Sequence, residues 1–369
     1  MEKLFQTSRI HNLELKNRFV RSATWEGMAT EDGSVTRKLI TTLQNLAKEE
    51  VGLIIPGHAY VQTRGKASPW QLGIYKDELI DGLQELTSSL HSAGGKVVVQ
   101  LAHAGHFTNE ELAGGTPMVA SEFEGLSNSP RQEFGKKDIQ VLIQDFARAA
   151  KRAKEAGFDG LQIHSAHGYL LSQFLSPAFN KRSDEYGGDI ENRSRVHVEI
   201  LQAIRQEVGD DYPVLIKLNS QDFDEQGLSL QDSLQVAKIL SQAGLDAIEL
   251  SGGLLTGGKL SPSRPDIDSP DKEAYFSTQA EKFKQELDLP LLLVGGIRSY
   301  ERANELVSNK IADYISMSRP LIREPDLIKR WQQGDLRPAK CVSDNLCFKP
   351  AMQGEGVYCL SEKRQSETD

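Results

Sequence analysis

The feature that most constrains the fold of this chain is an alternation of short apolar segments with longer stretches of helical apolar spacing. Such alternation is typical of βαβ units with parallel strands and right-handed crossovers. Eight strand candidates occur in order, at residues 19–23, 51–55, 97–101, 160–164, 214–218, 247–250, 291–294 and 314–317. Eight strands with intervening helices predict an α/β fold, a (β/α)8 TIM barrel with extended loops at its C-terminal face.

The helical stretches between these candidates are amphipathic. Residues 138–156 and 229–243 carry apolar side chains at three- and four-residue steps, as a helix that covers a sheet requires. Gly157 and Gly244 follow these stretches and suit the left-handed conformation after a helix end. An open doubly wound sheet is the alternative, but no G-x-G-x-x-G follows the first strand. A length of 369 residues would suit two domains, and the strand count favours one barrel.

Charge and composition narrow the class of partner. The chain has 43 Lys and Arg against 52 Asp and Glu, a net charge of −9, so it offers no basic field to nucleic acid or anionic lipid. No apolar stretch approaches the roughly 20 residues of a spanning helix, and the first residues lack an apolar signal core. We therefore expect a cytoplasmic protein with a small-molecule substrate, and homo-oligomerisation is left open.

A barrel brings the C-terminal ends of its strands to one site. The pairs at these positions are Thr24 and Trp25, Gly57 and His58, Gln100 and His103, His164 and His167, Lys217 and Asn219, Glu249 and Ser251, Gly295 and Gly296, and Ser318 and Arg319. Nearly all are polar or glycine, which indicates a ligand with many acceptors and a phosphate. Long loops at 107–135, 165–190 and 254–271 are expected at the same face.

The last two strand ends predict a phosphate site. Gly295 and Gly296 let the backbone approach an anion, and Ser318 and Arg319 place a permanent cation at the start of a short helix. The alternative is a tight turn with Arg319 paired to a local carboxylate such as Glu324.

Three proton-capable side chains, His164, His167 and Tyr169, lie within six residues where the fourth strand ends. Such a cluster can hydrogen-bond a carbonyl oxygen and deliver a proton. A zinc site at His164 and His167 is less favoured, because no carboxylate or cysteine stands at ligand spacing and such motifs usually lie on a helix. We therefore predict no metal among the site residues.

These residues resemble the old yellow enzyme family of FMN-dependent oxidoreductases, in order over roughly residues 1–335. The resemblance rests on Asn17-Arg18-Phe19, the segment from Gln100 to Gly105, His164-x-x-His167-x-Tyr169, the run NKRSDEYGG at 180–188 with Glu191-Asn192-Arg193, and Ser318-Arg319-Pro320. It implies a barrel that binds FMN noncovalently, takes electrons from NADH or NADPH, and passes hydride from flavin N5 to an activated alkene.

The resemblance also implies roles for individual residues. Its cofactor-binding set is Ala23, Thr24, Gly57, Gln100, Lys217, Gly295, Gly296, Ser318 and Arg319. Within this set, Gln100 would bond the pyrimidine edge of the flavin. Gly295, Gly296, Ser318 and Arg319 would hold its phosphate. His164 and His167 would hold the substrate oxygen, and Tyr169 would protonate the α-carbon. Two donors on a developing enolate contribute on the order of 3 to 4 kcal/mol each.

Two positions depart from the family pattern. Lys217 replaces the more usual Arg beside flavin N1 and O2, which keeps a cation but loses a planar fork. Trp25 stands where many relatives have Cys or Thr, and is expected to narrow the substrate pocket or to cover apolar surface at its rim.

The C-terminal tail, residues 336–369, contains all three cysteines. Cys341, Cys347 and Cys359 resemble the four-cysteine cluster motif of the 2,4-dienoyl-CoA reductase branch, but Asp344 occupies one thiolate position. Iron–sulfur clusters are usually held by four thiolates, so no cluster is predicted. We expect a 1–335 FMN-binding barrel with this tail packed on it or extending from it. Two alternatives remain: a nonredox TIM-barrel enzyme that uses His164 and His167 on a phosphorylated substrate, and a noncatalytic flavin-binding scaffold.

Overall fold

A closed ring of parallel strands forms the centre of the computed structural model, which describes residues 3–122 and 130–366. The strands are β3 (Phe19–Arg21), β4 (Leu53–Ile54), β6 (Val98–Ala102), β9 (Gly160–Ser165), β10 (Val214–Asn219), β11 (Ala247–Ser251), β12 (Leu291–Leu293) and β13 (Tyr314–Met317). They pair in the order β4-β3-β13-β12-β11-β10-β9-β6, and a parallel bridge from Ile54 to Val97 closes the ring. The predicted (β/α)8 barrel is confirmed, and each strand overlaps its candidate segment.

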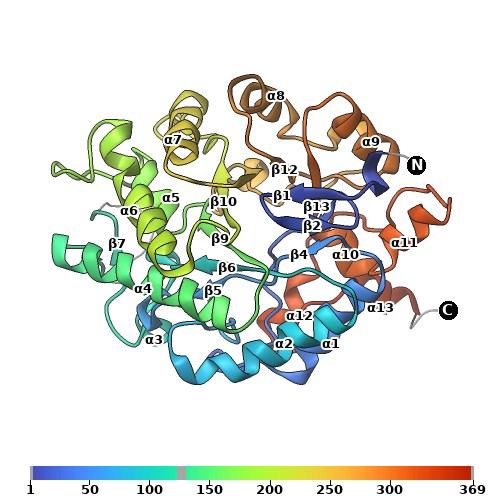
Figure 1. Cartoon of the computed structure of the whole chain (residues 1–369), viewed down its shortest axis with the longest axis horizontal. Coiled ribbons are helices and arrows are strands. Elements are labelled where there is room, and N and C mark those ends of the chain that lie inside the picture. The colour runs from blue at the N-terminus through green and yellow to red at the C-terminus, as the bar shows by residue number, and fades with distance from the viewer. Residues whose placement is uncertain (1–2, 123–129, 367–369) are drawn as a thin grey trace.

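Helices surround this ring, as Figure 1 shows. They are α1 (Arg37–Lys48), α2 (Ile80–Ser92), α4 (Lys136–Glu155), α6 (Ile190–Val208), α7 (Leu230–Gln242), α8 (Ser277–Glu286), α9 (Tyr300–Ser308), α10 (Arg319–Arg323) and α11 (Leu327–Gln332). The expected stretches 138–156 and 229–243 correspond to α4 and α7, and their periodic apolar residues are buried. Gly157 and Gly244 follow these helices with φ of 80° and 97°, in the left-handed conformation that the sequence predicted.

A hairpin that the sequence analysis did not predict closes the N-terminal end of the barrel. Its strands are β1 (Ser8–Ile10) and β2 (Leu13–Leu15). Ile10, Leu13 and Leu15 are buried in one apolar cluster with inward-facing strand residues that include Val98 and Leu215. This layer is separate from the larger core between strands and helices. The hairpin therefore seals the floor, and the C-terminal end carries the pocket.

Smaller elements lie in the loops and the tail. The remaining strands are β5 (Ala59–Tyr60), β7 (Met118–Val119) and β8 (Gln132–Glu133), and the remaining helices are α3 (Glu110–Ala113), α5 (Leu170–Leu175), α12 (Phe348–Met352) and α13 (Leu360–Ser366). The tail contacts the barrel through backbone bonds from Val357 to Glu26 (2.7 Å) and from Ala339 to Arg298 (2.8 Å). Within residues 3–122 and 130–366, no helix is long and apolar enough to cross a membrane.

Candidate active site

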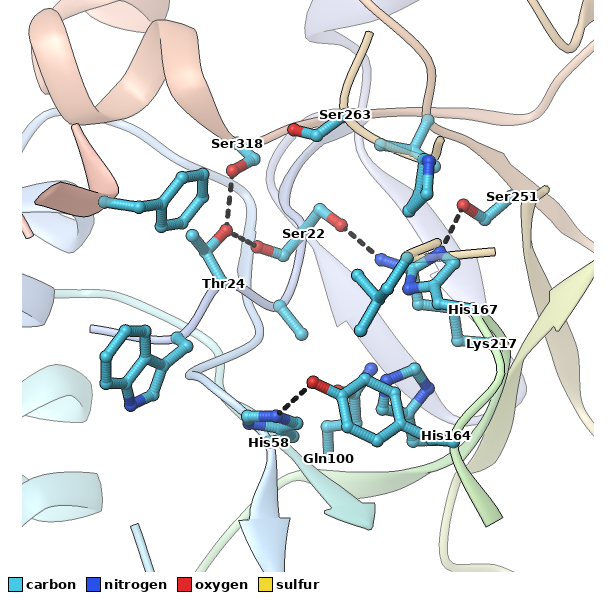
Figure 2. Close-up of a pocket in the computed structure, with 17 residues that line it drawn as sticks. Ser22, Thr24, His58, Gln100, His164, His167, Lys217, Ser251, Ser263 and Ser318 are labelled. Carbon is cyan, nitrogen blue, oxygen red and sulfur yellow. Dashed lines mark hydrogen bonds between the residues drawn. The ribbon is translucent and has the colours of Figure 1, made fainter. Parts of the chain in front are cut away.

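A pocket opens where the barrel strands end (Figure 2). Nine residues expected from the sequence line it: Ala23, Thr24, Trp25, Gln100, His164, His167, Tyr169, Lys217 and Ser318. A second, smaller cavity shares Ser318 with the pocket and is lined by Gly296 and Arg319. The lining of the pocket includes residues near or after the C-terminal ends of all eight barrel strands.

Two histidines and a tyrosine form one wall of the pocket. His164 ends β9 together with Ser165, and the rings of His164 and His167 lie 5.5 Å apart. His167 has a left-handed backbone, with φ of 66°, and its N–H donates to Asn219 Oδ1 at 3.1 Å. The turn brings Tyr169 back to a ring distance of 4.8 Å from His164. Strand and turn together aim the three groups into one space.

Burial fixes the protonation of this wall. It lowers the pKa of His164 and His167 well below the usual value, with neighbouring positive or imidazole groups adding to the effect. Burial also raises the pKa of Tyr169 to about 12. At neutral pH the two imidazoles are therefore uncharged, and the phenol keeps its proton. In this state the two histidines can form hydrogen bonds with a ligand, and the tyrosine beside them can donate a proton.

A buried polar chain runs under the pocket. Gln100 Nε2 donates to Gln162 Oε1 (2.7 Å), and Gln162 Nε2 donates to Glu249 Oε2 (2.9 Å). Lys217 Nζ lies 3.4 Å from the same carboxylate and donates to Ser22 Oγ at 2.7 Å. Because Gln162 donates its amide N–H to Glu249, its amide oxygen faces Gln100, and the orientation of both amides is set in turn. Sequence reasoning missed the part played by Gln162 and Glu249.

The smaller cavity is lined by a cation and by a turn rich in glycine. Arg319 is buried, and its Nη1 donates to Arg264 O (2.9 Å) and to Asn345 Oδ1 (2.7 Å). It does not pair with Glu324, which accepts from Arg330 at 3.1 Å instead. A Cβ on Gly296 would come within 2.7 Å of the Tyr275 ring, so a side chain there would crowd this turn. The local ion pair offered as an alternative is therefore not formed.

Gly57 and Gly295 do not line either cavity. The N–H of Gly57 donates to the Glu26 carboxylate at 3.0 Å, and it is the next residue, His58, whose side chain lines the pocket. Gly295 accepts from the N–H of Tyr275 at 3.1 Å. The sequence placed His58 at a strand end but gave it no role.

Other lining residues were given no individual role by the sequence, although the loop at 254–271 was expected at this face. They are Ser22, Ser251, Leu255, Pro262, Ser263, Val294 and Phe348. Ser251 Oγ lies 2.8 Å from His167 Nε2, and its place at a strand end was the available signal. Phe348 reaches the pocket from α12 in the tail. Within the described part of the chain, no group of three or more His, Cys, Asp or Glu side chains could hold a metal ion.

Comparison with known proteins identifies the family. A model described as the NADH:flavin oxidoreductase / NADH oxidase family matches residues 3–337. The solved structure of an old yellow enzyme homologue from Zymomonas mobilis superposes with a TM-score of 0.78 at 26% identity, over 93% of this chain and 99% of that one. The chain belongs to this family. This is the old yellow enzyme family that its motifs indicated.

Two relatives of this old yellow enzyme family member differ in how much of their own length the chain covers. The NADPH dehydrogenase of Geobacillus sp. (strain WCH70) is 38% identical over 323 residues, 87% of this chain and 91% of that protein. The NADH oxidase of Thermoanaerobacter brockii is 36% identical over 352 residues, 93% of this chain. The chain spans only 53% of that NADH oxidase.

The two cavities have the chemistry that FMN requires. The larger one offers an amide edge at Gln100 and a buried cation at Lys217, while the smaller one combines Gly296, Ser318 and Arg319. The first set suits a pyrimidine ring with acceptors and one N–H, and the second suits a phosphate. The residues present therefore fit this cofactor.

Proposed function

We propose that this protein reduces an activated C=C bond, such as that of an α,β-unsaturated carbonyl compound, with electrons from NADH or NADPH. The observation that carries the proposal is the wall on which two neutral histidines meet a protonated tyrosine. Bound FMN would supply the hydride, and the side chains would supply orientation, charge stabilisation and a proton.

Residues at both cavities would hold the cofactor. Gln100 would bond the pyrimidine edge and Lys217 would stabilise negative charge on it, while Ala23 and Thr24 would pack beside it. Gly295, Gly296, Ser318 and Arg319 would hold the phosphate. Gly57 would lie against the flavin ring through its backbone, in the segment that also carries His58. Ser318 lines both cavities, and its Oγ lies 2.7 Å from Thr24 Oγ1. Both observations support this arrangement.

The wall would then act on the substrate. His164 and His167 would hydrogen-bond the carbonyl oxygen and stabilise the negative charge that develops on it. Tyr169 would give its proton to the α-carbon. Trp25, Leu255 and Phe348 line the same pocket and would keep water from the reacting carbons.

We further propose a division into an FMN-binding barrel at 1–335 and a tail at 336–369. The contacts of Arg319 with Ser343 and Asn345 support docking of the tail on the barrel. The net charge of −9 supports the absence of a nucleic-acid partner, and a cytoplasmic location is part of the same proposal. Self-association into a homo-oligomer is tested by size-exclusion chromatography with light scattering.

Anaerobic stopped-flow spectroscopy of the FMN-loaded protein tests the function. NADH or NADPH should bleach the flavin, and an enone or enoate should restore its colour. Tyr169→Phe should slow the second step at least tenfold and leave the first within about twofold, because only the second needs a proton donor. A protein that does not take up FMN would favour the nonredox alternative. Bound flavin that neither nucleotide bleaches would favour the scaffold.

A further inference from the structure

The hydroxyl of Tyr169 has a partner that the proposed function does not use. His58 Nε2 lies 3.2 Å from Tyr169 Oη, and the two rings meet edge to face at 5.3 Å (Figure 2). His58 belongs to the segment between β4 and β5, 111 residues before Tyr169 in the chain. A side chain that touches the proposed proton donor can control what that donor does with its proton.

The backbone that carries His58 is held from both sides. The Gln71 side chain donates to His58 O at 3.0 Å. The Glu26 carboxylate accepts from the N–H of Gly57 at 3.0 Å and is paired with Arg21 at 2.8 Å. All of these groups are buried. The backbone that carries the imidazole is therefore held by the protein itself, which is what a group that orients another side chain requires.

The imidazole is also uncharged at neutral pH. Burial lowers the pKa of His58 to about 4, and the cation of Lys217 adds to this. A neutral imidazole has one N–H, so the contact has two possible directions. If Nε2 is the acceptor, the Tyr169 proton points at His58. If Nε2 carries the proton, Tyr169 oxygen accepts it and the phenolic hydrogen is free to reach substrate.

The other ionisable side chains that line the pocket are His164, His167 and Lys217. His167 Nε2 bonds Ser251 and Lys217 Nζ bonds Ser22, so both have partners elsewhere. The His164 ring lies 4.8 Å from that of Tyr169 at a tilt of 52°, and its Nδ1 is buried without a partner within the described residues. Among these groups, His58 is the one with a polar atom at hydrogen-bond distance from the phenol oxygen.

We propose that His58, as the Nε2–H tautomer, is a positioning residue that makes Tyr169 a proton donor. The inference rests on the proposed function. In the step concerned, the O–H bond of Tyr169 breaks as the electron pair of the enolate forms a C–H bond at the α-carbon. The phenolate that remains accepts the Nε2–H of His58, and water returns the proton after product leaves. His58 keeps its own proton throughout.

The test compares His58→Ala, His58→Gln and Tyr169→Phe in the FMN-loaded protein. With an enone, His58→Ala should slow flavin reoxidation about 10- to 100-fold, the effect of losing one hydrogen bond to a charged group. His58→Gln keeps an N–H donor and should recover most of the rate. The double variant His58→Ala, Tyr169→Phe should be no slower than Tyr169→Phe, since the histidine acts through the tyrosine.

Two controls separate proton delivery from other defects. Reduction of the flavin by the nicotinamide should stay within about twofold in each His58 variant. Reoxidation by a nitroalkene should also stay within about twofold, because its hydride adduct is a stable anion that can take its proton from water. A His58→Ala variant that slows all three reactions equally would overturn the proposal in favour of a structural role.

A measurement without turnover decides the tautomer. Nitrogen-15 NMR of protein labelled at histidine, with His58→Gln used to assign the signals, should show the His58 proton on Nε2. A proton on Nδ1, or an enone rate in His58→Ala equal to or above that of the unaltered protein, would overturn the proposal. A lack of enone reduction in the unaltered protein would instead refute the proposed function.

Discussion

His164 and His167 illustrate how single residues gain chemistry from burial. An exposed histidine is partly charged near neutral pH, whereas these two are neutral because charging them inside the protein costs desolvation energy. Each can then offer one N–H to an oxygen without carrying a charge of its own. A ligand with an anionic oxygen should bind to them most tightly, because hydrogen bonds to a charged acceptor are the strong ones.

His164→Ala and His167→Ala should each weaken binding of a phenol whose anionic oxygen mimics an enolate. Loss of one hydrogen bond to a charged oxygen is worth about 1.5 to 3 kcal/mol, or roughly 10- to 100-fold in affinity. The measurement is a spectrophotometric titration of the FMN-loaded protein. His11→Ala, on the β1–β2 turn, is the matched control and should titrate like the unaltered protein. Unchanged titrations in both pocket variants would contradict the oxygen-holding role.

Helix α12 shows what a short element contributes when its place is set by distant contacts. Phe348 is its first residue and lines the pocket, while Met352 is its last and is 71% exposed. Asn345, three residues before the helix, accepts from Arg319 and donates to Ser263 O at 2.8 Å. The tail is thereby tied to Arg319 and to the loop after β11.

Phe348→Ala should weaken FMN binding about tenfold or more. Phe348 is partly buried, so its truncation removes from the cofactor pocket up to about 1.5 to 3 kcal/mol of apolar contact, the range for a fully buried Phe side chain. Fluorescence quenching of FMN added to apoprotein measures the affinity. Met352→Ala changes the same helix at its exposed end and should leave the affinity unaltered. Equal affinities for all three proteins would show that the helix does not contribute to the cofactor site.

On the scale of the whole molecule, the buried histidines couple stability to pH. Burial lowers the pKa of His58 to about 4 and the pKa of His103 and His197 to about 3. In the unfolded chain these groups titrate near 6.5. At a pH between the native and unfolded pKa values, the unfolded state binds protons that the native state does not. The free energy of unfolding therefore increases as pH rises and decreases as pH falls.

The free energy of unfolding should therefore fall below about pH 6.5, by about 1.4 kcal/mol per pH unit for each such histidine. Urea unfolding at saturating FMN, repeated between pH 7 and pH 5, measures the slope. His197→Gln removes one titrating group outside the pocket, so its slope should be shallower by about one histidine's share. A slope that is the same in both proteins would contradict a neutral, buried His197.

Much of the fold was predictable because its signals are local. Alternating apolar segments gave the eight strands, and the glycines after α4 and α7 adopt the left-handed conformation that their positions required. The β1–β2 hairpin was missed, since its three-residue strands are too short to show a period. Its role as the barrel floor depends on Val98 and Leu215, far along the chain.

For the site, the sequence alone determined which residue types stand at the strand ends, because strand position and chain direction follow from local pattern. The tertiary structure decided which of them face the ligand. Gly57 turns its N–H to Glu26 while its neighbour His58 enters the pocket, and Glu249 orients Gln100 through Gln162. Phe348 joins from the tail. Hydrogen bonds and packing between residues far apart in sequence set these choices, and no local periodicity encodes them.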